Sequence, residues 1–427
     1  MNPISIATSL PSHWREVRFR YIAATSKGRL PAKEEEDVTV DVLPYLSMEY
    51  LRGDTEASQY VPAQGMLTAE DNDVLLLWDG SNAGEFLKAK HGAVSSTTSL
   101  VTPLQFDRQF LFWICKAVEP VLKTFTNGMG IPHVDGEFLK NLKLPCPTNP
   151  DEQSRIAIYL DREIVRIDGL IAEKERMLAL LEEKRAALIS RVVTRGLEPN
   201  VPLNPSGQEW LGEIPAHWGL QRIKYVIISI DQGSSPIAAN TPAGPDELGV
   251  LKLSAVSKGR FKREENKALR GTDEEEQLLS LRKGDVLITR GNTPELVADV
   301  ACVPYAEPNL LLPDLIYRLR VHEKKILPEY LTSFLTTAAA RVQIRRDARG
   351  SSGTMVKVSQ GHVLDWLTPL PPLNEQVEIV ECLERAEERF QSITREVSSS
   401  LSLLLERRTA LITAAVTGQI PPEEITS

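Results

Sequence analysis

Two short stretches of the chain contain the residue types that a metal-dependent nuclease would use. Pro245-Asp246 precedes Glu265-x-Lys267, and Pro313-Asp314 precedes Glu323-x-Lys325. Carboxylates in such stretches could hold a divalent cation, which would polarise a phosphate for attack. The pattern is short and common, and neither stretch has a counterpart in the other half of the chain. We therefore expect no nuclease site and no bound metal.

The other motifs that usually carry catalysis are absent from the sequence. It contains no Gly-x-x-x-x-Gly-Lys-Ser/Thr phosphate loop, no His-Glu-x-x-His and no Gly-x-Ser-x-Gly. It also lacks an Asn/Asp-Pro-Pro-aromatic segment that would grip a flipped base, and a glycine-rich loop suited to S-adenosylmethionine. His13 and His217 each lie beside a proline and a tryptophan, and we interpret them as packing and hydrogen-bonding residues. The sequence therefore predicts no catalytic residue.

Clusters of basic and polar residues in the second half have the composition of a DNA-binding surface. Arg290-Gly-Asn292 forms one cluster, 258–263 a second, and the arginines before Gly350-Ser-Ser-Gly353 a third. Basic side chains anchor phosphates, while arginine and asparagine can hydrogen-bond guanine and adenine edges. The predicted DNA-binding residues of this half are Lys258, Arg260, Lys262, Arg290, Asn292, Arg345, Arg346, Arg349 and Lys357.

The first half offers a less basic set of polar loops. Asp79-Gly-Ser-Asn82 matches the Arg290 loop, and the segment 124–130, followed by His133, matches the loop around Gly350. Each cluster alone could be an ordinary solvated face, but recurrence at matched places favours recognition. The predicted DNA-binding residues of this half are Asn82, Lys88, Lys90, Asn127 and His133.

The chain repeats itself. Pro11-Ser-His13-Trp14 recurs as Pro215-Ala-His217-Trp218, and Asp73-Val-Leu-Leu recurs as Asp285-Val-Leu-Ile. Further matches are Pro145-Cys-Pro with Pro369-Leu-Pro, and Glu152-Gln153 with Glu375-Gln376. From there 151–196 aligns with 374–419 without a gap, with 17 identities in 46 positions. The chain is therefore a duplication, in the order domain, helix, domain, helix.

The aligned segments have the pattern of long coiled-coil helices. Apolar residues recur at spacings of three and four, with charged interruptions such as Lys174, Arg185, Glu387 and Arg408. Asn149-Pro-Asp-Glu152 is a helix start in which asparagine caps free amides and the glutamate reaches back to the cap, and Gly196 and Gly418 suit left-handed stops. Each helix, of about 44 residues, would span roughly 66 Å. We predict that they pack antiparallel, Ile171 against Val397, Ile167 against Leu401 and Leu178 against Phe390.

The globular halves show short apolar runs broken by turn residues. Strands are expected at 74–77, 286–288, 298–303 and 315–321, and helices at 110–125 and 328–346. The predicted fold class is α+β: two mixed α/β domains, related by a pseudo-twofold axis and joined by two long antiparallel coiled-coil helices. The predicted segments are a first domain at 1–149, a helix at 150–196, a linker at 197–209, a second domain at 210–372, a helix at 373–418 and a tail at 419–427.

Bulk composition limits the function classes. The chain has 427 residues and a net charge of −9, but the acidic excess is uneven, and 205–373 is nearly balanced. No apolar run is long enough to cross a membrane, and the first ten residues do not resemble a secretory signal. Cys115, Cys146, Cys302 and Cys382 are scattered, which favours reduced, buried thiols. A cytoplasmic protein with no membrane partner is expected.

The doubled order of motifs resembles the specificity subunit of type I restriction-modification systems. The resemblance rests on the Pro-x-His-Trp start, the Asp-Val-Leu strand, the glycine-rich loop before a Pro-x-Pro exit, and the Glu-Gln start of a helix ending in Glu-x-Arg-x-Ala-Leu-Ile, each present twice. It implies two target recognition domains that read a bipartite site in double-stranded DNA. It also implies partners: two adenine-N6 modification subunits and restriction subunits that translocate DNA. S-adenosylmethionine, ATP and Mg are then expected on the partners, and none on this chain. The alternatives are a coiled-coil scaffold without DNA recognition and a stand-alone DNA-modifying enzyme.

Overall fold

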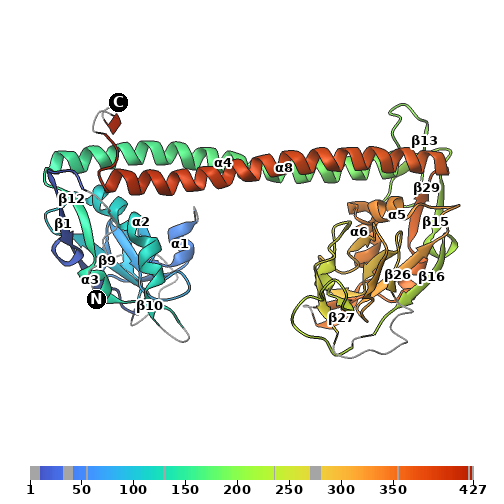
Figure 1. The fold of residues 1–427 in the computed structure, drawn as a ribbon, viewed down its shortest axis with the longest axis horizontal. Helices are drawn as coiled ribbons and strands as arrows, with labels where there is room; N and C mark the ends of the chain where they lie inside the picture. Colours follow the sequence, from blue (N-terminus) through green and yellow to red (C-terminus); the bar gives the residue numbers. More distant parts are fainter. Residues whose placement is uncertain are drawn as a thin grey trace. The chain divides into compact units, whose positions relative to one another are not determined.

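The computed structural model describes residues 10–31, 42–53, 56–127, 131–234, 236–269, 280–352, 355–421 and 424–425. The chain divides into two compact units: Met1–Arg176 with Val397–Ser427, and Met177–Glu396. Each unit combines one globular domain with a part of each long helix (Figure 1). The units are described one at a time.

Two four-stranded sheets form the globular domain of the first unit. One is antiparallel, in the order β2-β9-β6-β7. The other has the order β4-β3-β8-β5, in which β3 and β8 pair in parallel. A ribbon of β1 and β12 places the chain's entry into the domain beside its exit. The bounds are β1 Trp14–Arg18, β2 Ala23–Lys27, β3 Val42–Leu46, β4 Tyr60–Pro62, β5 Thr68–Ala69, β6 Val74–Leu77, β7 Phe86–Lys88, β8 Gly92–Val94, β9 Thr98–Pro103 and β12 Lys143–Pro147.

The domain of the second unit repeats this topology strand by strand. Its sheets have the orders β16-β26-β22-β24 and β20-β17-β25-β21, again with one parallel pair, β17 with β25, and its ribbon is β15 with β29. The duplication predicted from the sequence is therefore confirmed in the fold. The bounds are β15 Gly219–Arg222, β16 Ile227–Gln232, β17 Gly249–Leu251, β20 Asn266–Ala268, β21 Ser280–Leu281, β22 Val286–Thr289, β24 Val300–Cys302, β25 Glu307–Leu311, β26 Ile316–Val321 and β29 Leu367–Leu370.

The repeated Asp-Val-Leu motif has the same structural role in both domains. Asp73 Oδ2 accepts the backbone N–H of Glu70 at 2.8 Å, and Asp285 Oδ2 accepts that of Arg282, also at 2.8 Å. Each aspartate thus closes the turn that precedes a central strand, β6 or β22. All four residues of that strand are buried. The aspartate is retained in both copies because the turn needs an acceptor there.

Short helices cover the sheets. In the first unit they are α1 Met48–Arg52, α2 Arg108–Thr124 and α3 Gly136–Asn141; in the second they are α5 Pro328–Leu335, α6 Ala338–Asp347 and α7 Gln360–Asp365. The helix predicted over 110–125 corresponds to α2. The single helix predicted over 328–346 is wrong, because Thr337 leaves the helical conformation and caps α6 by accepting the N–H of Ala340.

The two long helices, α4 Pro150–Arg195 and α8 Leu373–Val416, end within two residues of the predicted bounds. Asn149 Oδ1 accepts the N–H of Asp151 at 2.9 Å, as its predicted capping role requires. Gly196 and Gly418 adopt left-handed φ angles of 74° and 71°, as expected of helix stops. The residues predicted to form the packing seam are buried or half-buried, including Ile167, Ile171, Leu178, Phe390, Val397 and Leu401.

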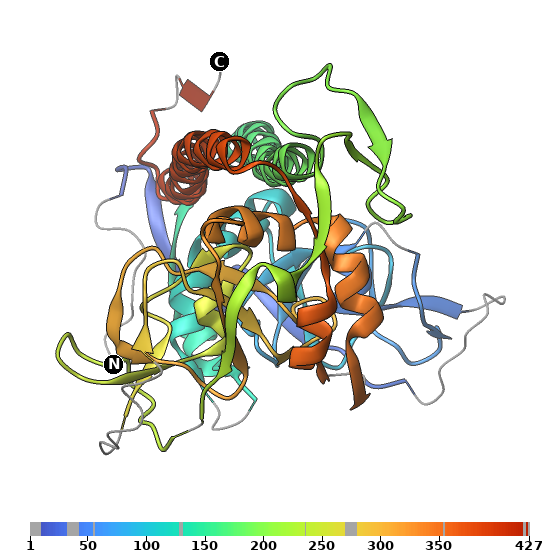
Figure 2. The same cartoon turned by 90° about the vertical axis from the view of Figure 1, so that its right-hand side faces the viewer.

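Within each unit the portions of α4 and α8 lie side by side (Figure 2) and run in opposite directions (Figure 1). In the first unit Arg408 Nε donates to Asp168 Oδ1 at 2.7 Å, and in the second Arg185 Nε donates to Glu387 Oε2 at 2.5 Å. Counted from these ion pairs, Ile171 falls opposite the region of Leu404, and Leu178 opposite the region of Thr394. The predicted register is therefore wrong by about one to two helical turns, because charged seam positions, which the apolar pattern ignores, fix the alignment.

The repeated motifs meet where each domain joins its helices. In the first unit Trp14 Nε1 donates to Glu152 Oε1 at 3.0 Å, and His13 Nε2 lies 3.1 Å from the same oxygen. In the second, Trp218 Nε1 donates to Glu375 Oε2 at 2.9 Å, and His217 Nε2 lies 2.7 Å from Oε1. The predicted return of Glu152 to the helix cap is therefore corrected, since its carboxylate binds the domain entrance.

The glutamine that follows each glutamate ties the helix start to the domain core. Gln153 is buried, donates to Pro147 O and accepts the N–H of Asp107, the cap of α2. Gln376 is buried, donates to Pro371 O and accepts the N–H of Leu327, the cap of α5. The Glu-Gln pair is thus the sequence signature of this joint.

Each entrance tryptophan also contacts the end of the other long helix. A Cβ atom on Gly418 would lie 3.3 Å from the Trp14 ring, and one on Gly196 would lie 3.2 Å from the Trp218 ring. The segment predicted as a linker at 197–209 contributes to the second joint, since β13 Leu203–Pro205 pairs with β14 Glu213–Pro215. Leu197 within this segment, and Trp210 and Leu211 just after it, pack on the core of the second unit.

Trp218→Ala is expected to lower the free energy of unfolding by about 3–5 kcal/mol, because it removes a buried aromatic ring and leaves a cavity. Trp218→Phe, which keeps an aromatic ring but loses the hydrogen bond to Glu375 and part of the indole, should cost less, about 1–2 kcal/mol. Chemical denaturation of the full chain measures both. Equal, small losses for the two variants would show that the joint does not depend on the ring.

Candidate nucleic-acid interface

A three-stranded sheet in the second unit gathers four of the predicted DNA-binding residues. β28 Met355–Lys357 pairs with β23 Gly291–Asn292 on one side and with β27 Arg349–Ser352 on the other. The register places Lys357 opposite both Gly291 and Arg349. Arg290 immediately precedes β23, and its carbonyl accepts the N–H of Val358 at 2.9 Å. We call Arg290, Asn292, Arg349 and Lys357 the β28 cluster.

The charges of the β28 cluster suit an anionic ligand. Arg349 and Lys357 are exposed at paired positions, and neither forms an ion pair within the described part of the chain. Like charges directly opposite each other destabilise a sheet, and a phosphate between them would remove the repulsion. Arg290 is half-buried near Tyr317; burial raises the pKa of this phenol and the positive charge of Arg290 opposes the rise.

The corresponding surface of the first unit is less basic, as predicted. β10 Thr126–Asn127 pairs with β11 His133–Val134, and a bridge joins His133 to Asp79. The 79–82 loop therefore lies against this hairpin, and both Asn82 and His133 are exposed. Lys27 Nζ donates to Asp79 Oδ2 at 2.7 Å. The negative charge of Asp79 at this surface is therefore balanced by the positive charge of Lys27. Residues 128–130 and the side chain of Asn127 lie outside the described residues.

Two lysines predicted to bind DNA in the first unit have partners within the protein. Lys88 pairs with Asp161 of α4 at 3.3 Å and lies 5.0 Å from the centre of the Phe112 ring. Lys90 Nζ donates to Tyr50 O at 2.9 Å and to Gly53 O at 2.8 Å, which holds α1 in place. Both residues therefore have structural roles within the first unit, and their predicted DNA contacts stay predictions. Lysine content alone could not reveal these carbonyl and carboxylate partners.

Several predicted residues of the second unit also lie away from the β28 cluster. Arg260 forms an ion pair with Glu387 on α8, and Lys258 and Arg345 line a cavity beside Glu182 and Glu183 of α4. Arg346 pairs with Asp347 at 3.0 Å. The predicted DNA contacts of these four residues stay predictions, while the structure places their side chains beside the helices or against their own neighbours. Lys262 is exposed, and its predicted DNA contact stays a prediction.

Sequence reasoning missed two acidic residues that bind the domains to the helices. They are Asp161, which accepts Trp113 Nε1 at 3.1 Å in addition to pairing with Lys88, and Glu387. The sequence did contain one indication of the role of Glu387, because its charge interrupts the apolar pattern of the helix seam. No comparable signal marked Asp161.

The nuclease-like stretches do not assemble a metal site in the described part of the chain. Lys267 and Asp314, one from each stretch, line a single cavity of about 570 Å³. Glu265 instead accepts Ser254 Oγ at 2.6 Å, which with Lys252 lowers the pKa of its carboxyl. No three His, Cys, Asp or Glu side chains are gathered as metal ligands among the described residues.

The four cysteines are free thiols. Cys115 and Cys146 are buried as predicted, whereas Cys302 and Cys382 are half-buried. Burial raises the pKa of the Cys146 thiol to about 12, partly offset by the charge of Arg15. A thiol with such a pKa is protonated at neutral pH and therefore a poor nucleophile or metal ligand.

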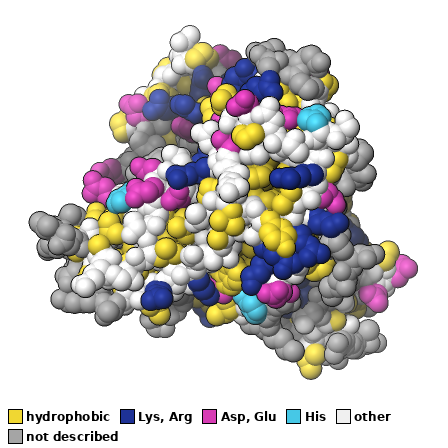
Figure 3. Space-filling model, turned by 90° about the vertical axis from the view of Figure 1, so that its left-hand side faces the viewer, with side chains coloured by type: hydrophobic (Ala, Val, Ile, Leu, Met, Phe, Trp, Pro, Cys, Tyr) yellow, Lys and Arg dark blue, Asp and Glu magenta, His cyan; other side chains and the backbone are white. Residues whose placement is uncertain are grey.

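Neither sign of charge dominates the face of the molecule drawn in Figure 3, where Lys and Arg side chains and Asp and Glu side chains occur in separate small groups. A net charge of −9 is therefore compatible with local basic surfaces such as the β28 cluster. Within the described ranges, no helix combines the length and apolar character that a membrane crossing needs.

A duplicated α/β domain, with a polar surface at matched places in each copy, is typical of a binding protein with two recognition surfaces. The sequence matches the family described as type I restriction modification DNA specificity domain over residues 11–175 and 246–401. These ranges include most of both globular halves and most of the two long helices. The chain belongs to this family.

Curated relatives are described as specificity subunits of type I restriction enzymes. The chain is 34% identical over 221 residues to the specificity subunit of the type I restriction enzyme MjaVIII of Methanocaldococcus jannaschii, covering 51% of this chain and 50% of the relative. It is 24% identical over 307 residues to the EcoKI specificity subunit of Escherichia coli, covering 70% of this chain and 62% of the relative. The matches thus span about half to three fifths of these relatives.

The fold also has a counterpart among solved structures. A chain from a study of complex assembly and conformational transition in a type I R-M system superposes with a TM-score of 0.70 at 16% identity, covering 97% of this chain and 100% of that chain. At this identity the similarity concerns the fold alone.

Proposed function

We propose that this chain is the DNA specificity subunit of a type I restriction-modification system. Each globular domain reads one part of a bipartite site in double-stranded DNA, and the chain directs two adenine-N6 methyltransferase subunits and restriction subunits to that site. The observation that carries the proposal is the duplication itself: a DNA specificity domain family matches both halves, and both halves have the same topology.

The chain supplies recognition and its partners supply chemistry. The described residues contain no metal-ligand cluster, and the sequence contains no nucleotide or S-adenosylmethionine motif. In this proposal S-adenosylmethionine, ATP and Mg bind to the modification and restriction subunits.

Two linked recognition domains give high specificity from few contacts. Each base contact contributes about 1–3 kcal/mol of discrimination. When one domain is bound, the joined helices make binding of the second domain effectively intramolecular. Because the groove repeats about every 34–36 Å, the two parts of the site must also lie at a defined spacing.

Methylome sequencing of cells with and without this chain, in the presence of its modification subunits, tests the proposal. We expect a bipartite methylated adenine motif that depends on the chain. A motif without a spacer, or methylation unaffected by loss of the chain, would contradict it.

The alternatives predict different results. A stand-alone modifying enzyme would transfer label from S-adenosylmethionine to DNA when the purified chain is incubated alone, and we expect no transfer. A coiled-coil scaffold would give no salt-dependent DNA gel shift in the presence of the modification subunits.

Lys357→Ala is expected to weaken DNA binding similarly for all sequences and to reduce the slope of log affinity against log salt by about one, because it removes one phosphate contact. Asn292→Ala should instead relax base preference at one position of one half-site. Lys283→Ala, an exposed lysine outside the β28 cluster, is the control. If Lys283→Ala and Lys357→Ala change the salt slope equally, the β28 cluster is not a DNA surface.

A further inference from the structure

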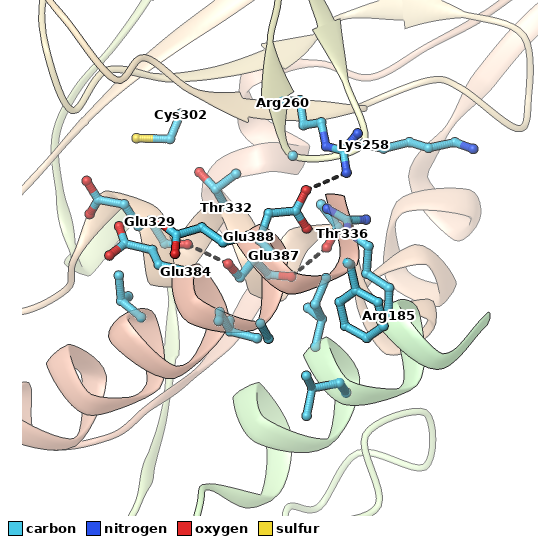
Figure 4. A pocket seen from close by; sticks show the side chains of 18 of the residues that line it. Arg185, Lys258, Arg260, Cys302, Glu329, Thr332, Thr336, Glu384, Glu387 and Glu388 are labelled. Atoms are coloured by element: carbon cyan, nitrogen blue, oxygen red, sulfur yellow. Dashed lines mark hydrogen bonds and ion pairs between the residues drawn. The ribbon is translucent and has the colours of Figure 1, made fainter. Parts of the chain in front are cut away.

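In the second unit one carboxylate connects both long helices to the recognition domain. Glu387 lies on α8; Arg185 of α4 donates to its Oε2 at 2.5 Å, and Arg260 of the globular domain donates to its Oε1. Gln391, one turn further along α8, also donates to Oε1 at 2.9 Å. Figure 4 shows Arg260 reaching from the domain toward Glu387 above the helices. We call Arg185, Arg260 and Glu387 the brace.

Arg260, the residue that the domain contributes to the brace, lies on a hairpin that is held rigidly. Arg260 begins the second strand of a tight hairpin, β18 Val256–Ser257 with β19 Arg260–Phe261. Both turn residues adopt left-handed conformations, with φ of 48° at Lys258 and 82° at Gly259, as two-residue hairpin turns require. Asp299 Oδ1 accepts the N–H of Lys258 at 2.9 Å, and Gly259 N–H donates to Val300 O at 2.8 Å. The hairpin is therefore fixed to the domain core.

Open space separates the domain from the helices next to the brace. A cavity of about 460 Å³ is lined by Leu188 of α4, Phe390 of α8 and Thr332 of α5, and a second of about 670 Å³ by Glu182 of α4 and Arg341 of α6. Arg185 lines both cavities. The brace thus crosses a gap that apolar packing does not fill.

The brace acts at a distance from the joint. Gln376, in the joint, precedes Glu387 by eleven residues, which corresponds to roughly 17 Å along α8. A contact at that distance resists tilting of the domain about the joint far better than the joint itself. The first unit has a similar contact, in which Asp161 of α4 binds Lys88 and Trp113.

The electrostatics agree with a persistent contact. Burial alone would raise the pKa of Glu387, but hydrogen bonds from Arg185 and Gln391 and the charges of Arg185 and Arg260 outweigh burial and lower it. Glu387 therefore remains ionised at neutral pH, with one carboxylate oxygen directed to each arginine.

We infer that the Arg260–Glu387 contact sets the tilt of the second recognition domain on the helix pair, and so determines which spacings between the two parts of the DNA site are accepted. Glu387 and Arg260 are positioning residues that touch no base. This inference rests on the proposed function.

The brace offers a matched pair of variants. Arg260→Gln removes the domain arm and keeps the pairing of the helices, whereas Arg185→Gln removes the helix arm and keeps the domain contact. Each is compared with wild type in complex with the modification subunits, on DNA libraries in which the spacer varies by one base pair at a time. Amide hydrogen exchange of the purified chain reports on the 256–261 hairpin independently of DNA.

For Arg260→Gln we expect faster exchange in the hairpin, a 5- to 30-fold loss of discrimination against spacers one base pair too long or short, and unchanged half-site sequences. Arg260→Lys should recover most of the discrimination, and Arg185→Gln should keep it. Methylation lowered equally at all spacings would show that Arg260 contacts DNA, and an unchanged spacing profile would also overturn the inference. If wild type methylates no bipartite site, the proposed function fails, while unchanged hairpin exchange separately rejects the brace.

Discussion

Replacing the second recognition domain with that of another family member is expected to change one half of the methylated site completely and to leave the other half unchanged. The exchange would cover 210–372 but keep His217 and Trp218, which bind Glu375 at the joint. Because each mismatched base pair costs about 1–3 kcal/mol, several altered positions should lower methylation of the original site by at least about 10³-fold. Methylome sequencing of the chimera measures both halves at once.

The reciprocal exchange of the first domain is the control for this result. It should change only the other half of the site, since each domain has its own hydrophobic core and its own joint. A chimera in which both half-site sequences changed would show that the domains do not read DNA independently.

The sequence predicted the two domains, the long helices and their joints well, because the duplication keeps the residues that form them in both copies. Each repeated motif has the same structural task in both copies. Trp14 and Trp218 bind the first turn of a long helix, Gln153 and Gln376 accept the N–H of the residue that caps a neighbouring helix, and Asp73 and Asp285 close a turn. Matching residues could therefore be found without knowledge of the contacts that they make.

The DNA-binding residues were harder to predict, because a basic side chain can bind a carboxylate or a carbonyl of the protein as well as a phosphate. Lys88, Lys90 and Lys357 are all lysines in loops or short strands, yet Lys88 binds a carboxylate of α4 and Lys90 binds two carbonyls of its own domain. Lys357 is exposed on β28, opposite Arg349. Only the strand register, which depends on pairing with residues far away in the chain, separates these cases.

The helix register failed for a related reason. An apolar seam with spacings of three and four is nearly the same after a shift of one turn, so the pattern alone gives several registers of similar quality. The charged interruptions distinguish them. Arg185 and Arg408 each require an acidic residue on the other helix, and the structure supplies Glu387 and Asp168.

The joints also change how the spacing between half-sites should be tested. Trp14 contacts the start of α4 and the end of α8, while Trp218 contacts the end of α4 and the start of α8. The two helices must therefore keep equal lengths between the joints. A deletion in one helix alone is expected to break a joint and destabilise the chain.

Deleting one heptad from each helix, 171–177 and 397–403, is expected to shorten the preferred spacer and to leave both half-site sequences intact. The paired deletion keeps the three-and-four spacing of both seams. Seven residues correspond to roughly 10 Å of helix, or about three base pairs of DNA. Three base pairs also turn the groove by about 100°, so methylation at the new best spacing should be slower than that of wild type. Methylation of a spacer library measures the shift, and deletion of 171–177 alone, followed by thermal unfolding, is the control. A paired deletion that kept the original spacing would mean that the long helices do not set the distance at which DNA is read.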